Sequence, residues 1–310
     1  MTRPTLSRRQ ALFAGAALPF ASALLSTPVQ AAAELQGASM PLFNRFKLGA
    51  FEVTTLLSGS RTVENPGEIF GLNVDPAEFA AVSEAAFLPT DRAQFFFTPT
   101  LVNTGAELVL FDTGVSADGM VAALAAAGIT PDQIDVVVLT HMHGDHIGGM
   151  MTNGAPTFAN ARYVTGSTEH NFWAAAGNEG FDAMVRPLND RFTFLEDGGA
   201  VMGGLTAMAA TGHTPGHMAY MIESDGQRLA LIADAANHPV WSVAYPDWEV
   251  RFDADKAAAA ATRRALFGML AAEKVPFIGY HMPFPAIGYV ETRDTGFRYV
   301  PASYQMMLNG

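Results

Sequence analysis

The chain has 310 residues, 49% hydrophobic and 15% charged, with a formal net charge of −12. This composition predicts a folded chain rather than a disordered one, and the acidic balance disfavours nucleic acid and membrane surfaces as partners. There is no cysteine, which excludes disulfides, thiolate nucleophiles, iron–sulfur clusters and Cys-ligated zinc, so any metal site must use His, Asp and Glu.

Residues 1–31 have the three parts of a secretory signal peptide. Arg8 and Arg9 precede an apolar run over 11–25, and residues 29–31 resemble the A-x-A type of signal-peptide cleavage site. The paired arginines predict the twin-arginine route. Because the apolar run is shorter than the roughly 20 residues that span a bilayer, we expect a periplasmic or secreted protein with no membrane contact after signal removal.

The next segments predict strands. Residues 51–57 alternate between polar and apolar types and predict a strand that stops at 58–60. The β-prone runs 94–101 and 108–112, joined by a turn at 103–105, predict a hairpin.

Helices and strands alternate in the rest of the chain. The Ala-rich segment 120–127 predicts a helix, and 130–133 resembles a helix start with Thr as cap and Pro at the first position. The β-branched run in 135–140 predicts a strand buried on both faces. Further strands are predicted over 161–165, 206–210, 219–223, 229–233 and 277–281, and a helix over 255–272. This mixture indicates an α/β or α+β class with layered sheets.

A dense cluster of metal-ligand types directly follows the buried strand. His141, His143, Asp145 and His146 lie within six residues. A loop held at the end of a buried strand is where α/β proteins place their sites. A single histidine in such a loop is more often structural, but imidazoles and a carboxylate at this spacing predict a site for zinc or a similar metal.

Other candidate ligands also follow predicted strands. His213 and His217 lie in the turn-rich loop 212–217, Asp234 follows a strand, and His281 closes another. These positions are expected if several strand ends converge on one site. Taken alone, Asp234 is equally compatible with a helix cap or a turn.

Seven of these residues occur in an order that resembles the metallo-β-lactamase fold superfamily: His141, His143, Asp145, His146, His217, Asp234 and His281. Asp112 in Phe-Asp-Thr-Gly matches the first motif of that superfamily. The resemblance is closest to the methyl parathion hydrolase branch, which is related to dizinc lactonases. It covers nearly all of 43–305. The metal motifs are highly specific for the superfamily. The segments that carry the branch resemblance are moderately specific; they are 51–54, 101–105, 212–217, 284–289 and 299–301.

The resemblance implies a single domain over 43–305, an αββα sandwich of two packed mixed sheets flanked by helices, with two zinc ions at one edge. Manganese, cobalt or iron would suit the same ligand types, and the branch suggests a homodimer. By motif position, the resemblance assigns one zinc to His141, His143 and His217, the other to Asp145, His146 and His281, and a bridging role to Asp234. It implies that Asp112 orients a ligand or loop and that His213 orders its loop.

The implied chemistry is hydrolysis by a hydroxide held between two metals, which lower the pKa of water towards 7. Asp145 and Asp234 are the implied catalytic carboxylates. The substrate would be a small ester-type molecule: a lactone, an aryl or carboxylic ester, or a phosphotriester. Trp173 and Phe181 match pocket aromatics of the branch, with core packing as an equal alternative. Lactonases of the superfamily often place a tyrosine three residues after the bridging aspartate, but this chain has Asn237 there.

Two other functions compete with this interpretation. One is a non-catalytic periplasmic zinc-binding protein, although such a protein has no use for a bridging carboxylate and an open water position. The other is a β-lactamase of the all-His type, which the extended branch resemblance disfavours.

Overall fold

The computed structural model describes residue 35 and residues 37–308, so the predicted signal peptide lies outside the described residues. Residues 1–40 and 41–310 form separate units, and the following description concerns the second. In the part of the chain that the structure describes, no helix has both the length and the apolar character needed to cross a membrane.

The first sheet is mixed. Its last four strands are parallel to one another and its first four pair antiparallel. In spatial order it contains β1 (Phe43–Leu48), β2 (Phe51–Leu56), β5 (Thr100–Asn103), β6 (Leu108–Phe111), β7 (Val136–Val138), β10 (Arg162–Gly166) and β11 (Phe192–Leu195).

The second sheet also has seven strands, and its one parallel pair, β15 with β16, is joined by a helical crossover. In spatial order it contains β12 (Ala200–Met202), β13 (Leu205–Ala209), β14 (Met218–Ser224), β15 (Gln227–Ala233), β16 (Phe277–Gly279), β17 (Ile287–Arg293) and β18 (Gly296–Pro301).

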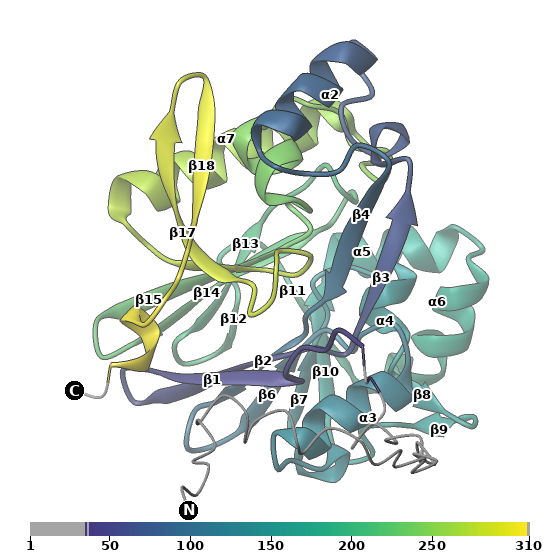
Figure 1. Ribbon diagram of the computed structural model, residues 1–310. Coiled ribbons are helices and arrows are strands. Elements are labelled where there is room, and N and C mark those ends of the chain that lie inside the picture. Colours follow the sequence, from purple (N-terminus) through teal and green to yellow (C-terminus); the bar gives the residue numbers. More distant parts are fainter. Residues whose placement is uncertain (1–34, 36, 309–310) are drawn as a thin grey trace, which may run out of the picture. The chain divides into compact units, whose positions relative to one another are not determined.

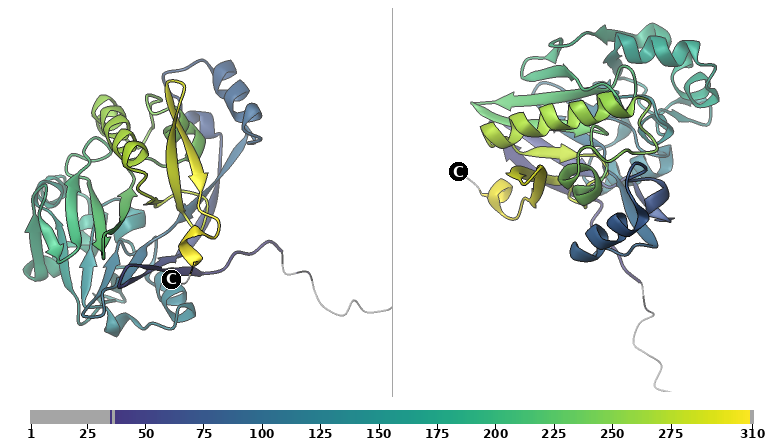
Figure 2. Two further views of the ribbon diagram at one scale, coloured as in Figure 1. Left: turned by 90° about the vertical axis from the view of Figure 1, so that its left-hand side faces the viewer. Right: turned by 90° about the horizontal axis from the view of Figure 1, so that it is seen from above.

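Helices cover the outer faces of both sheets. Figure 2 shows α7 (Lys256–Glu273) lying along the second sheet, whereas α3 (Ala117–Ala126), α5 (Ser167–Ala175) and α6 (Glu179–Met184) lie beside the first (Figure 1). The expected αββα sandwich is therefore confirmed.

Strand β7 shows how the layers are held together. Val136 and Val138 pack into the core between the sheets, and Val137 packs against the helices on the outer face. All three side chains are fully buried, because side chains of a strand alternate between its two faces and both faces are covered. The prediction of a strand buried on both sides is confirmed.

A two-stranded ribbon, β3 (Gly59–Glu64) with β4 (Arg92–Phe97), rises from the sheets and carries α2 (Pro76–Ala85) (Figure 1). An aromatic cluster that includes Phe70 and Trp241 packs beside it. The remaining short elements are η1 (Pro66–Glu68), η2 (Pro131–Gln133), α4 (Gly144–Ile147), β8 (Met151–Thr152), β9 (Ala155–Pro156), η3 (Arg186–Arg191), the π-helical η4 (Pro239–Ala244) and η5 (Gln305–Met307).

Some sequence-based expectations differ from the structure. The run 94–101 is two strands, since Pro99 has no N–H for a sheet ladder and the chain breaks there. Residues 59–60, expected to end a strand, begin β3. The helix start at 130–133 is a single 3₁₀ turn. Helices α2, α5 and α6 were not predicted from the sequence.

Candidate metal centre

The candidate residues meet at one edge of the two sheets. Asp112 follows β6, His141 follows β7, Asp234 follows β15 and His281 follows β16. Both strand pairs are parallel, and the carboxyl ends of parallel strands meet at the same edge. His213 reaches the same place from the loop between β13 and β14.

The backbone is strained where two of these strands end. Asp112 and Ala233 have φ angles of 61° and 43°, in the left-handed region that costs a residue with a Cβ about 1 kcal/mol. The pairing of β15 with β16 also shifts register between Leu231 and Ala233. These irregular turns place the carboxylates of Asp112 and Asp234 in the site.

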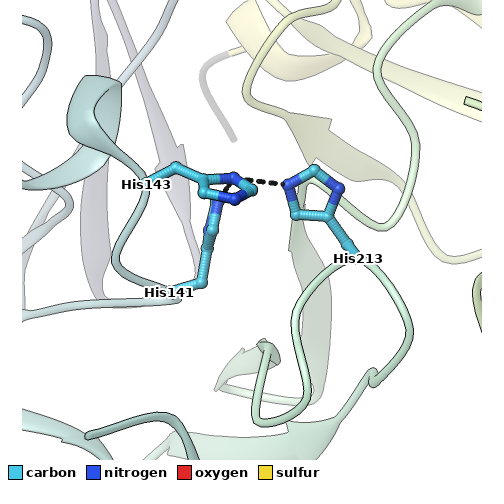
Figure 3. Close-up of side chains that lie close together, drawn as sticks. All are labelled: His141, His143 and His213. Carbon is cyan, nitrogen blue, oxygen red and sulfur yellow. Dashed lines mark hydrogen bonds between the residues drawn. The ribbon is translucent and has the colours of Figure 1, made fainter. Parts of the chain in front are cut away.

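The three-histidine group consists of His141, His143 and His213. Nδ1 of His143 lies 3.0 Å from Nε2 of His141 and 3.0 Å from Nε2 of His213. Figure 3 shows the three rings converging from two loops. His141 and His213 are buried and His143 is half-buried.

One buried carboxylate and one hydroxyl fix the tautomers of two rings of this group. His213 donates from Nδ1 to Asp253, 3.0 Å away, and Asp253 pairs at 2.9 Å with the fully buried guanidinium of Arg263. Nδ1 of His141 lies 3.2 Å from the Thr140 hydroxyl. Because Nδ1 of these two rings carries the proton, Nε2 of each presents a lone pair to the centre of the group. His143 instead faces that centre with its Nδ1.

The mixed group consists of Asp145, His146 and His281. Oδ2 of Asp145 lies 3.7 Å from Nε2 of His146 and 3.4 Å from Nε2 of His281. Both rings are again held from the far side: His146 donates from Nδ1 to Asp112 at 2.8 Å, and His281 donates to the carbonyl of Phe96 at 2.9 Å. The orienting role expected of Asp112 agrees with this contact.

Asp234 lies between the two groups. Its Oδ2 is 3.3 Å from Nε2 of His213 and 3.1 Å from Nε2 of His281, and its Oδ1 is 3.3 Å from Nε2 of His146. One buried carboxylate therefore contacts a ring of each group. This is the position that the sequence analysis assigned to a bridging ligand.

The two groups differ in protonation. Burial and the nearby charge of His213 lower the pKa of His143 to about 4, and burial and the charge of His146 lower that of His141 well below its usual value. Burial also disfavours the charged form of His281, but Asp234 and Asp145 outweigh it and raise its pKa to about 10. The pKa of His146 is raised for the same reason, chiefly by Asp234.

The donor set fits two divalent cations. Nδ1 of His143 lies 3.0 Å from the Nε2 atoms of both His141 and His213. This is close to the N···N edge of about 3.3 Å in a tetrahedron with Zn–N bonds of about 2 Å. Beside the mixed group, Nε2 of His146 and the adjacent Oδ1 of Asp234 are buried without a hydrogen-bond partner. Buried polar atoms rarely lack a partner, and a bound cation would be a partner for both of these atoms.

The structure places His213, and not His217, in the three-histidine group, which differs from the expected assignment. His217 donates from Nδ1 to the carbonyl of Ala210 at 3.0 Å and accepts the backbone N–H of Asp234 at Nε2, 3.1 Å away. Neither ring nitrogen of His217 is therefore free. His217 orders the backbone around the site, and the two histidines exchange the roles that motif position gave them.

The two expected pocket aromatics differ in position. Trp173 is half-buried and its ring meets the ring of His143 edge-on, with centroids 5.6 Å apart. Phe181 is fully buried and packs against His170 in the core of the first layer, so we correct its role from pocket to core packing. Asn237 donates to Oδ2 of Asp234 at 2.9 Å.

Sequence reasoning missed three residues that support the centre: Asp253, Arg263 and Glu169. Arg263 had a detectable signal, because it is a charge on the helix face that carries Leu266, Phe267 and Leu270 to the core. Glu169 and Asp253 had none, since acidic residues near helix starts are common.

Comparisons with known proteins place these features in a family. A model of the metallo-beta-lactamase superfamily matches residues 98–276, more than half of the chain. The N-acyl homoserine lactonase of Bacillus cereus is 28% identical over 121 residues, which is 39% of this chain and 46% of that lactonase. The lactonase AttM of Azorhizobium caulinodans is 28% identical over 135 residues, covering 38% and 48%. The chain thus spans about half the length of these relatives.

Solved structures resemble the chain over a longer stretch. AidC, a dizinc quorum-quenching lactonase in complex with the product N-hexanoyl-L-homoserine, superposes with a TM-score of 0.79 at 26% identity. The match covers 86% of this chain and 100% of AidC. The hydrolase AbOPH of the beta lactamase superfamily has the same TM-score and coverage at 23% identity, a likeness of fold alone.

Proposed function

The chain belongs to the metallo-β-lactamase superfamily, and from this premise we propose that it is a dinuclear metal hydrolase that opens lactones or cleaves related ester bonds. One observation carries the proposal: the three-histidine group and the mixed group lie side by side and share Asp234. We take zinc as the metal because imidazole and carboxylate ligands suit it, and because AidC is a dizinc enzyme.

Two divalent cations bound in these groups would lower the pKa of a shared water and polarise a substrate oxygen. The chain's own residues would hold the cations and orient their ligands. Asp234 spans both groups, and Asn237 fixes one of its oxygens by a hydrogen bond. The side chain of Asp145 is 27% exposed, against 4% for Asp234. Proton exchange between the site and solvent is therefore assigned to Asp145.

A lactone or carboxylic ester is the substrate class we favour. Support comes from the lactonase relatives and from AidC, whose structure holds an acyl-homoserine product. The half-buried ring of Trp173 beside His143 offers an apolar wall for an acyl chain. Because Asn237 is bonded to Asp234, it does not replace the tyrosine donor of other lactonases. We infer that leaving groups of low pKa, as in aryl esters, are turned over faster than alkyl esters.

The test is metal content together with initial rates on four substrates: an N-acyl homoserine lactone, an aryl ester, a phosphotriester and a β-lactam. We expect about two zinc ions per chain and rates that chelation removes and zinc restores, highest on the lactone or the aryl ester. Asp118→Ala, an exposed carboxylate on α3, serves as a control that should keep both properties.

Other outcomes assign other functions. Two bound zinc ions without turnover of any substrate would favour a zinc-binding protein, and a highest rate on the β-lactam would favour an all-His β-lactamase. Turnover that persists after complete removal of metal would contradict the proposal.

We also propose that the protein is exported by the twin-arginine route and forms a homodimer. The export proposal rests on the pattern of residues 1–31 and the dimer on the branch resemblance. Fractionation of producing cells should find a processed chain outside the cytoplasm, and Arg8→Lys with Arg9→Lys should retain it inside. A full-length cytoplasmic chain would contradict export. Light scattering would test the dimer.

A further inference from the structure

Glu169 is a fully buried carboxylate near the start of α5. In the described residues it forms no ion pair with Lys, Arg or His. Its charge is met instead by hydrogen-bond donors and by its place in the first turn of α5, where the helix dipole favours a carboxylate. Buried carboxylates are rarely kept without a cation, so the donors around Glu169 indicate what it is for.

Four donors from three parts of the chain meet this carboxylate. Oε1 accepts the backbone N–H of Met142 at 3.0 Å and the indole N–H of Trp173 at 2.6 Å. Oε2 accepts the hydroxyl of Thr214 at 2.7 Å and the backbone N–H of Gly216 at 3.0 Å.

These donors belong to the loops that carry the three-histidine group. Met142 lies between His141 and His143, while Thr214 and Gly216 follow His213. One carboxylate therefore bonds both ligand loops and also fixes the indole that packs against His143.

The packing at Gly216 is an independent sign of the same attachment. A Cβ at this position would lie 2.1 Å from the backbone nitrogen of Glu169 and 2.5 Å from its Cα. Only glycine fits there, because the loop backbone rests directly on the start of α5. The loop that carries His213 is thus held to α5 by both packing and hydrogen bonds.

We infer that Glu169 is a positioning residue that sets the geometry of the three-histidine group by bonding both of its loops. The inference rests on the proposed function, since it assumes that this group holds a metal. Glutamine cannot replace Glu169, although it has the same shape. Each carboxylate oxygen faces two donors, at least one of them an N–H that cannot reverse, so an amide NH₂ placed at either oxygen would face a donor.

The experiment measures zinc affinity by competition with a chromogenic chelator, with no substrate present. It uses the His281→Ala variant as background. The mixed group has lost a ligand there, so the measured zinc affinity is that of the three-histidine group alone. In this background we expect Glu169→Gln to weaken zinc binding tenfold to a hundredfold, the usual effect of losing a contact that orients ligands. The matched control Glu179→Gln, an exposed residue of α6, should bind as the background does.

A second readout separates positioning from general stability. Co²⁺ bound by the folded Glu169→Gln variant should show altered visible absorption, which reports ligand geometry, while its circular dichroism stays native. If Glu169→Gln does not fold, Trp173→Phe, which removes one donor of the four, should weaken zinc binding in the same direction by a smaller factor.

The outcomes distinguish the two proposals. If the unmodified protein binds no zinc, the proposed function and this inference both fail. If it binds two zinc ions and Glu169→Gln binds with unchanged affinity and an unchanged Co²⁺ spectrum, only the role of Glu169 is wrong.

Discussion

The three-histidine group and the mixed group lie side by side and share Asp234, but they prepare their ligands in opposite ways. In the first, burial and neighbouring imidazoles lower the pKa of His141 well below its usual value and that of His143 to about 4. In the second, carboxylates surround the rings and raise the pKa of His281 to about 10. His141 and His143 are therefore ready for a cation at neutral pH, whereas the rings of the second group must release protons to bind one.

The two groups also differ in what lies behind their rings. His213 is backed by Asp253, whose charge is already paired with Arg263. His146 is backed by Asp112, a buried carboxylate that is hydrogen-bonded to Thr140 and, among the described residues, pairs with no Lys or Arg. The charge of Asp112 adds to that of Asp234 in raising the pKa of His146, whereas the charge of Asp253 is balanced by Arg263. The following predictions test this contrast.

Asp234→Ala should have the largest effect, because it removes the one carboxylate common to both groups. We expect fewer than two zinc ions per chain. Activity should fall about 10³-fold or more, because the two metals are needed to lower the pKa of the attacking water. Metal analysis and kcat/KM measure this. Full activity in this variant would break the assignment of a shared ligand.

Replacing each of the two histidines of the 212–217 loop by alanine should distinguish the metal ligand from the structural residue. His213→Ala is expected to lose one zinc ion per chain and to keep its fold. His217→Ala removes two bonds to the backbone, so we expect a free energy of unfolding lower by about 1–3 kcal/mol. Metal analysis and thermal melting distinguish them. The reverse pattern would restore His217 as the ligand.

The pH dependence of zinc affinity should differ between the groups. Because the pKa of His281 is raised to about 10, both of its ring nitrogens carry a proton at pH 7. The proton on Nε2 must leave when metal binds there. The pKa of His146 is raised as well, so affinity at the mixed group should rise at least about tenfold per pH unit from pH 7 to pH 9. Affinity at the three-histidine group should stay nearly flat there, because the pKa of His143 lies far below that range. Chelator competition across pH measures both, and equal slopes would contradict the contrast.

Asp253→Asn should have the smallest effect and a selective one. The amide keeps an acceptor for His213 but loses the charge paired with Arg263. We expect zinc affinity at the three-histidine group to fall about tenfold, with the mixed group unchanged. Arg264, which pairs with Asp247 at the surface, provides a control: Arg264→Met should leave zinc affinity unchanged. An equal fall at both groups would show that the two are not independently supported.

The sequence predicted much of this arrangement where local pattern and long-range structure agree. The β-branched run of β7 predicted a buried strand, and the cluster after it predicted a metal site at a strand end. The αββα architecture followed from the resemblance that these motifs carried. In such segments the local pattern is enough, because the strand and the ligands belong to one continuous stretch.

What the sequence did not determine depends on loop geometry. His213 and His217 lie in the same loop, and only the fold shows that His217 lies immediately before β14 with both ring nitrogens hydrogen-bonded to the backbone. Phe181 likewise matched a pocket position but is in the core. Glu169 and Asp253 act through residues distant in the chain, and no spacing rule reveals such contacts. Position in the three-dimensional fold, rather than residue type, decided each case.

The central claim is that two cations bind at these two groups on either side of Asp234. Anomalous X-ray diffraction from crystals grown with zinc tests it most directly. We predict two zinc peaks, one ligated by His141, His143 and His213, the other by Asp145, His146 and His281, with an oxygen of Asp234 beside each. A single peak, or a zinc ion ligated by His217 with His213 turned away, would contradict the account.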